Sequence, residues 1–88
     1  MPRVQVTKQE IEKAFDFVKK ALEGRLMQKG DGAFASHHEI YGVLAEEFDE
    51  LGDELRKNTK DDFAGELIDI AVGAVFAIAC VKSNKVGK

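Results

Sequence analysis

The sequence contains few of the residues that define disulfide-rich, cysteine-ligated or proline-rich proteins. Its 88 residues include one cysteine, Cys80, one proline, Pro2, and no tryptophan. A single cysteine excludes an intrachain disulfide and a zinc site built from cysteines. Because Cys80 lies in an apolar run, we expect a buried, unreactive thiol. The unpaired cysteine and the lack of a recognisable secretory signal lead us to expect a cytoplasmic location.

The sequence also lacks a basic stripe, a glycine-rich phosphate loop and an internal repeat. Its 13 Lys and Arg residues are outnumbered by 16 Asp and Glu residues, and the formal net charge is -3. This balance argues against a nucleic-acid partner. A small phosphorylated ligand remains compatible with it, because a metal ion can join acidic side chains to phosphate. A chain of this length has room for one core, so we predict a single domain over residues 1–88.

Hydrophobic periodicity predicts an all-α fold whose first helix covers residues 8–28. Residues 1–6 form an N-terminal arm, and Thr7 with Glu10 has the pattern of a capping box. Gly30 supplies the C-terminal cap. The expected apolar stripe has helical spacing and consists of Ile11, Ala14, Phe15, Val18, Leu22 and Leu26.

Two further helices are predicted to form an antiparallel hairpin. A second capping box, Ser36 with Glu39, begins a helix that ends near residue 57, and Thr59 can cap a third helix over residues 60–82. Residues 83–88 form a polar tail. The expected apolar stripe of the second helix consists of Ile40, Leu44, Phe48, Leu51 and Leu55.

The third predicted helix is apolar on nearly all sides. From residue 67 to residue 81 its one charged residue is Asp69. We judge the run too short and too closely flanked by charge to span a membrane, so no membrane partner is expected. One helix pair cannot cover every face of such a helix in a soluble chain. We therefore expect a homodimer or homotetramer with this helix at its centre.

Acidic residues are concentrated in two places on the predicted hairpin. Six of the nine residues from 46 to 54 are acidic, and Glu66 and Asp69 follow on the next helix. The i, i+3 spacing of Glu47 with Glu50, and of Glu66 with Asp69, puts each pair on one side of its helix. Four carboxylates on facing helices would form an oxygen site suited to Mg²⁺, with Mn²⁺ as a substitute.

The alternative interpretation of the acidic run is a solvated helix face. The helical wheel directs Glu46, Asp49 and Asp53 toward solvent and puts Glu47 and Glu54 at the edge of the apolar stripe. Solvation does not explain Asp69, because a carboxylate in an apolar helix needs a partner.

These motifs resemble those of the all-α MazG-like nucleotide pyrophosphohydrolases, a superfamily that includes dimeric dUTPases. That superfamily carries E-E-x-x-E and, one loop later, E-x-x-D on the next helix. Here the motifs are Glu46-Glu47-Phe48-Asp49-Glu50 and Glu66-Leu67-Ile68-Asp69, with fifteen residues between them. The stretch from Ser36 to Leu44 also resembles a compact, phage-like branch. Together these features cover about half of the chain, residues 36–81.

The resemblance implies a MazG-like helical bundle that hydrolyses a nucleoside triphosphate to a monophosphate and pyrophosphate. It implies that Glu47, Glu50, Glu66 and Asp69 bind Mg²⁺. Either Glu46 or Glu50 is the catalytic base, and the sequence does not choose between them. The family's usual fourth helix is absent here, so the lid is missing, supplied by another subunit, or made by the first helix.

The sequence offers four weaker substrate contacts and a non-enzymatic alternative. Lys82, Asn84 and Lys85 lie where the family often places polar ligand contacts, and His38 could contact a base. The lysines could equally complement a helix dipole, and His38 could simply occupy the first turn of the second helix. The alternative function is a non-catalytic helical oligomer or adaptor that keeps the same fold.

Overall fold

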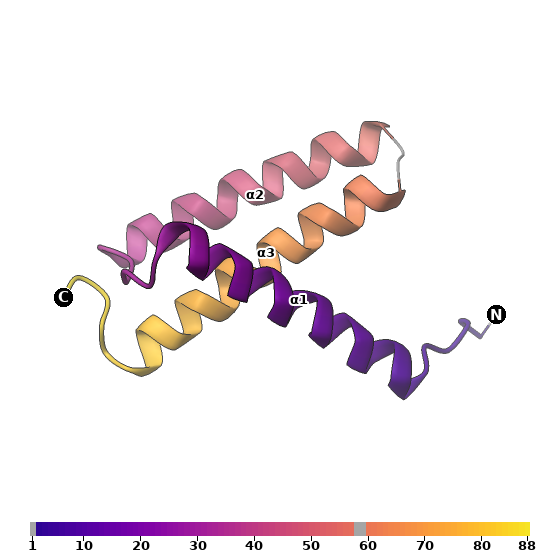
Figure 1. Cartoon of the computed structure of the whole chain (residues 1–88). Helices are drawn as coiled ribbons and strands as arrows, with labels where there is room; N and C mark the ends of the chain where they lie inside the picture. The colour runs from indigo at the N-terminus through magenta and orange to yellow at the C-terminus, as the bar shows by residue number, and fades with distance from the viewer. Residues whose placement is uncertain (1, 58–59) are drawn as a thin grey trace.

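The protein is described from a computed structural model that covers residues 2–57 and 60–88. The chain forms three helices, α1 (Lys8–Lys29), α2 (His37–Lys57) and α3 (Lys60–Lys82) (Figure 1). The described residues contain no strand, which confirms the all-α prediction. The observed bounds lie within about one residue of those predicted from the caps and the apolar periodicity.

The capping box and the glycine cap predicted for α1 are both present. Thr7 Oγ1 accepts a hydrogen bond from the backbone N–H of Glu10 at 3.1 Å, and Glu10 Oε1 accepts one from the backbone N–H of Thr7 at 2.8 Å. At the other end Gly30 adopts a φ of 80° and donates its N–H to the carbonyl of Leu26 at 2.8 Å. Glycine tolerates this φ without steric cost, which explains why the helix ends there.

The start of α2 differs in one detail from the predicted capping box. Ser36 Oγ accepts the backbone N–H of Glu39 at 3.0 Å, as expected. The Glu39 carboxylate, however, accepts the backbone N–H of Ala35 at 2.7 Å rather than that of Ser36. The reciprocal bond therefore reaches one residue further back. The cap predicted at Thr59 lies outside the described residues.

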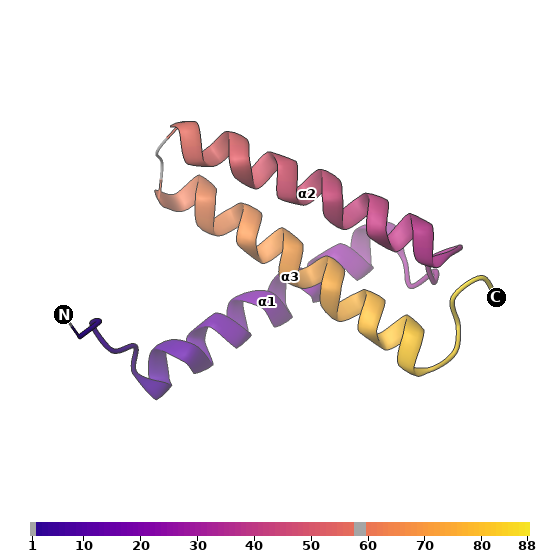
Figure 2. The same cartoon turned by 180° about the vertical axis from the view of Figure 1, so that it is seen from behind.

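Both α1 and α2 pack on α3, which lies between them (Figures 1 and 2). The α2–α3 hairpin is antiparallel, as predicted, while α1 crosses α3 at a steep angle. The hairpin packs closely at Gly73, where an added Cβ would lie 3.2 Å from Leu44 Cδ2. The tail is tied down as well, because the Gly87 N–H donates to the carbonyl of Phe34 at 2.9 Å.

The core of the single chain is very small. Among the described residues the buried side chains are Val72, Ala77 and Cys80, all on α3. This confirms the prediction that Cys80 is a buried thiol. Only the C-terminal half of α1 contributes to packing, through half-buried residues such as Val18, Leu22 and Leu26.

Five residues assigned to the apolar stripes are exposed, so these parts of the prediction are wrong: Ile11, Ala14, Phe15, Phe48 and Leu55. Ile11 and Phe15 are 48% and 71% exposed, because the first half of α1 projects beyond α3 (Figure 1). Phe48 and Leu55 are each 67% exposed. They lie on the flank of α2, while the half-buried side chains that face α3 are Ile40, Val43, Leu44, Glu47, Leu51 and Glu54.

The prediction that the third helix is too short for a membrane is also wrong as regards length. α3 has 23 residues, and an 18-residue window with a mean hydropathy of 2.0 is long and apolar enough to cross a bilayer. Only 17% of that window is buried within the chain. The core helix of a soluble assembly has the same composition, so the absence of a membrane partner stays a prediction.

Substitutions of glycine should show how tightly α2 packs on α3. Replacing Gly24, which has open space around it in α1, with alanine should stabilise the fold by about 0.5–1 kcal/mol. Gly73→Val should instead lower stability by about 1–3 kcal/mol, because the larger side chain collides with Leu44. Urea unfolding midpoints measure both effects. Equal stabilisation by the two substitutions would contradict the close packing.

Candidate metal site

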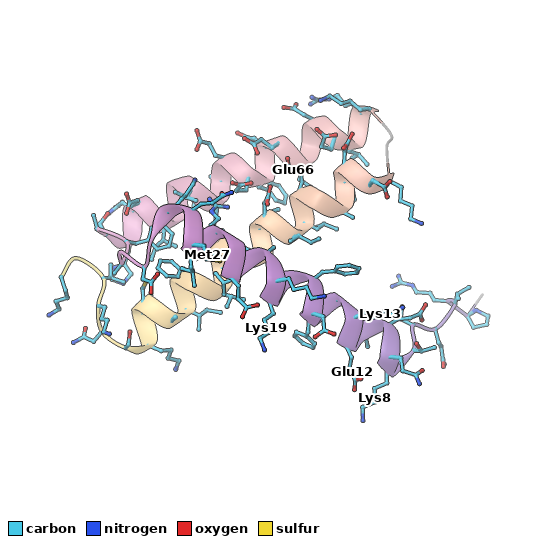
Figure 3. The ribbon with its side chains drawn as sticks, viewed as in Figure 1. Lys8, Glu12, Lys13, Lys19, Met27 and Glu66 are labelled. Atoms are coloured by element: carbon cyan, nitrogen blue, oxygen red, sulfur yellow. The ribbon has the colours of Figure 1, made fainter. Side chains whose placement is uncertain are left out.

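Glu47 on α2 faces Glu66 and Asp69 on α3 across the hairpin. One carboxylate oxygen from each residue lies within 4.8 Å of the other two, and all three residues are half-buried. Figure 3 shows Glu66 between the two helices. The antiparallel packing brings them together, because Glu66 and Asp69 are one turn apart on the side of α3 that faces α2. We call these three residues the carboxylate cluster.

Two oxygens of the carboxylate cluster are buried and have no hydrogen-bond donor among the described residues. These atoms are Glu47 Oε2 and Glu66 Oε2. A buried carboxylate oxygen without a donor is costly, because it has lost its bonds to water and gained none in exchange. The cluster therefore needs either a proton or a cation.

A similar oxygen lies further along α2. Glu54 Oε2 is also buried and unpartnered, but Glu54 Oε1 accepts a bond from Lys57 Nζ at 3.2 Å. The lysine partly compensates this carboxylate from its own helix.

Burial and like charges make Glu47 and Glu66 less acidic than ordinary glutamates. Desolvation raises the pKa of Glu47 above its usual 4.5, and the charges of Glu50 and Asp69 raise it further. The pKa of Glu66 is raised by desolvation and by the charges of Glu50, Asp69 and Glu47, and a hydrogen bond with the Glu50 side chain adds to the shift. Proton sharing is the expected response when like charges are held this close.

The donor set fits a hard divalent cation. Carboxylate oxygens are the ligands that Mg²⁺ and Mn²⁺ prefer, and a cation would compensate both unpartnered oxygens at once. Glu50 is exposed and acts on Glu66 from the open edge of the carboxylate cluster, but its carboxylate is not among those that converge, so the structure brings together three of the four predicted ligands.

The other predicted site residues are not brought to the carboxylate cluster. Glu46 is exposed and makes the smallest of the contributions that raise the pKa of Glu47. Lys82 lies about 20 Å beyond Asp69 along α3, and His38 about 14 Å from Glu47 along α2. Asn84 and Lys85 follow α3 in an exposed turn. Within one chain these five residues are not part of the group formed by the three carboxylates.

One charged residue near the site is absent from the sequence-based prediction. Arg25 on α1 is half-buried, and its charge lowers the pKa of Glu47, opposing the carboxylates. Its spacing of three from Leu22 and seven from Val18 puts it on the packed face of α1, which is the signal that could have identified it. The crossing of α1 over α3 then determines that it approaches Glu47.

Arg25 also lines a mainly apolar cavity of about 220 Å³ where the three helices meet. The cavity adjoins the carboxylate cluster, because Val43 lies one turn from Glu47 and Gly73 one turn from Asp69. Its aromatic walls are Phe34 and Phe76, whose rings are 5.7 Å apart in an edge-on arrangement.

Comparison of the chain with protein-family models, with curated proteins and with solved structures finds no match. Membership of the MazG-like superfamily therefore remains a prediction from residues 46–50 and 66–69.

The raised pKa values predict how the metal-free protein responds to pH. The folded chain retains protons on Glu47 and Glu66 at pH values where the unfolded chain has lost them. Stability should therefore fall as pH rises from about 4.5 through the higher pKa values of the folded state. Glu66→Gln should flatten this fall and raise the melting temperature at pH 7 in EDTA.

Glu12→Gln, a change on the exposed face of α1, is the matched control and should leave the pH profile of the wild type unaltered. The measurement is thermal unfolding between pH 4 and pH 8. A Glu66→Gln profile that coincides with that of the wild type would show that charge repulsion in the carboxylate cluster does not lower the stability of the fold.

Proposed function

We propose that the protein is a Mg²⁺-dependent nucleoside triphosphate pyrophosphohydrolase. The observation that carries the proposal is the convergence of Glu47, Glu66 and Asp69, with two buried oxygens that have no donor. The order of the two acidic motifs, which resembles that of the MazG-like enzymes, supports nucleotide chemistry rather than a purely structural metal.

The residues of the chain divide into holding and reacting groups. Glu47, Glu66 and Asp69 would hold the cation, with Glu50 at the open edge. Mg²⁺ bound there would neutralise negative charge on the phosphate oxygens as the α-phosphate is attacked. We favour Glu50 over Glu46 as the base that accepts the proton of the attacking water. Glu50 is exposed to solvent, and its charge acts on both Glu47 and Glu66, whereas Glu46 makes only the smallest contribution at Glu47.

The cavity beside the carboxylate cluster suits the nucleoside part of the substrate. Its volume is below the roughly 300–1,000 Å³ of pockets that enclose a whole small molecule, so it would take a single planar ring system. Phe34 and Phe76 offer aromatic surface, and Arg25 lines the cavity while its charge acts on Glu47. A base in the cavity would leave the phosphates directed toward the carboxylates.

Removing a ligand should abolish both metal binding and turnover. Mg²⁺ or Mn²⁺ at millimolar concentration should raise the melting temperature of the wild type, and a non-hydrolysable nucleotide should raise it further. Asp69→Asn should eliminate both shifts and lower the rate of pyrophosphate release roughly 100-fold or more. Mutating even a residue that only hydrogen-bonds to a metal ligand lowers metal affinity or activity by about 10–100-fold. Melting curves and ³¹P NMR of the products supply the measurements.

Asp49→Asn is the control for this experiment, because Asp49 is acidic, lies on α2 and is exposed. It should retain both the shifts and the activity. Metal-dependent stabilisation without turnover of any nucleoside triphosphate would favour the non-catalytic oligomer or adaptor. No shift with either metal would contradict the site itself.

The choice of base can be tested with a pair of variants. Glu50→Gln should lower kcat by about 10²–10⁴-fold, the usual contribution of a general base, while the stabilisation by Mg²⁺ is largely retained. Glu46→Gln should change kcat only slightly. Single-turnover rates and melting curves of the two variants distinguish these roles. The reverse order of effects would assign the base to Glu46.

A further inference from the structure

The α2–α3 hairpin leaves an apolar face uncovered on the side opposite α1. Figure 2 views this side, with α2 and α3 in front of α1. Two shallow grooves on it meet at Leu44, one along α2 and one between α2 and the C-terminal half of α3. The residues that line them are mainly apolar and include Tyr41, Ala45 and Phe48 from α2 and Ala74, Ile78 and Val81 from α3.

The α2 part of this face has the spacing of a coiled-coil seam. Its residues are spaced alternately four and three positions apart. We call them the α2 seam, which consists of Tyr41, Ala45, Phe48, Gly52 and Leu55. The three large side chains are all more than 60% exposed, and Tyr41 is 78% exposed. Except at Gly52, which is half-buried, the α2 seam is exposed and distinct from the residues of α2 that pack on α3, so α2 has a second apolar face without a partner.

The area of the chain indicates how much surface remains to be covered. The accessible surface is 7378 Å², whereas a compact monomer of 9.7 kDa exposes about 5,100 Å². The radius of gyration, 14.9 Å, likewise exceeds the roughly 12 Å of a compact chain of this length. The excess of roughly 2,300 Å² per chain is on the scale of an obligate dimer interface. The projecting half of α1 contributes part of it, and the hairpin face contributes another part.

We propose that a second copy of this chain covers the hairpin face, with the two α2 seams packed antiparallel about a two-fold axis. The proposal does not depend on catalysis. The alternation of large and small side chains carries it, because a two-fold axis near residues 46 and 47 places Phe48 on the partner's Ala45 and Tyr41 on the partner's Gly52. Each ring then meets a small residue, which lets the two helices pack closely.

A lipid surface fits this face less well than a second copy does. The exposed acids Glu46, Asp49 and Asp53 lie on the same helix as the α2 seam, and the adjacent basic residues are confined to its end. Anionic lipids would repel such a helix. A second copy carries the same acids, but they lie beside the α2 seam and can stay in solvent, while the seam itself is uncharged.

The oligomeric state of the pure protein tests the proposal. Sedimentation equilibrium should give twice the chain mass of 9.7 kDa at micromolar concentration, without detergent or lipid. Phe48→Glu should raise the dissociation constant of the dimer roughly 100-fold or more, because it buries an uncompensated charge. Met27→Glu, at an apolar position of α1 that is 89% exposed and away from the hairpin face, should leave it unchanged.

Cysteine cross-linking tests the direction of the pairing without destabilising the chain. In a Cys80→Ala background, Ala45→Cys lies about 5 Å along the axis from its copy in the antiparallel dimer, whereas Leu55→Cys lies about 25 Å from its copy. Oxidation should therefore link the first variant and not the second. Linkage of both would overturn the antiparallel arrangement. A monomer, or a protein that associates only with vesicles, would overturn the second copy as the occupant of this face.

Discussion

The antiparallel packing of α2 on α3 is the constraint on which the rest of the structure depends. It places Gly73 against Leu44 and, one turn further, Asp69 and Glu66 against Glu47. Apolar contact thus holds like charges together that would repel each other in isolated helices. In the metal-free chain the repulsion between these carboxylates destabilises the same pair of helices that provides the packing. We therefore expect the hairpin to be most stable when a proton or a cation occupies the carboxylate cluster.

Local features of the fold could be predicted from the sequence, because their causes lie within a few residues. The Thr7–Glu10 capping box and the cap at Gly30 depend on neighbouring backbone groups, and the predicted helix ends agree with the observed ones. The convergence of Glu47, Glu66 and Asp69 could also be predicted from the sequence. An i, i+3 pair and a short link largely determine which side chains meet across a hairpin.

Features that depend on distant parts of the chain could not be predicted in the same way. On α2 a broad apolar arc includes Leu44 and Phe48, yet Leu44 packs on α3 and Phe48 stays exposed. Periodicity identifies that an arc is apolar and not which partner covers it. The prediction that Phe15 is buried is wrong for a related reason, because the crossing of α1 over α3 determines where the contact between these two helices ends. The role of Arg25 beside Glu47 depends on the same crossing.

The chain therefore leaves two deficits that molecules outside it would satisfy. One is the negative charge of the carboxylate cluster, and the other is the apolar area of the hairpin face. The carboxylate cluster and the hairpin face share the same part of α2. The proposed two-fold axis passes near residues 46 and 47, and Glu47 belongs to the carboxylate cluster. A partner that fixes α2 also fixes the Glu47 backbone. Under both proposals, cation binding and self-association would be linked through α2, and by linkage each would change the free energy of the other by the same amount.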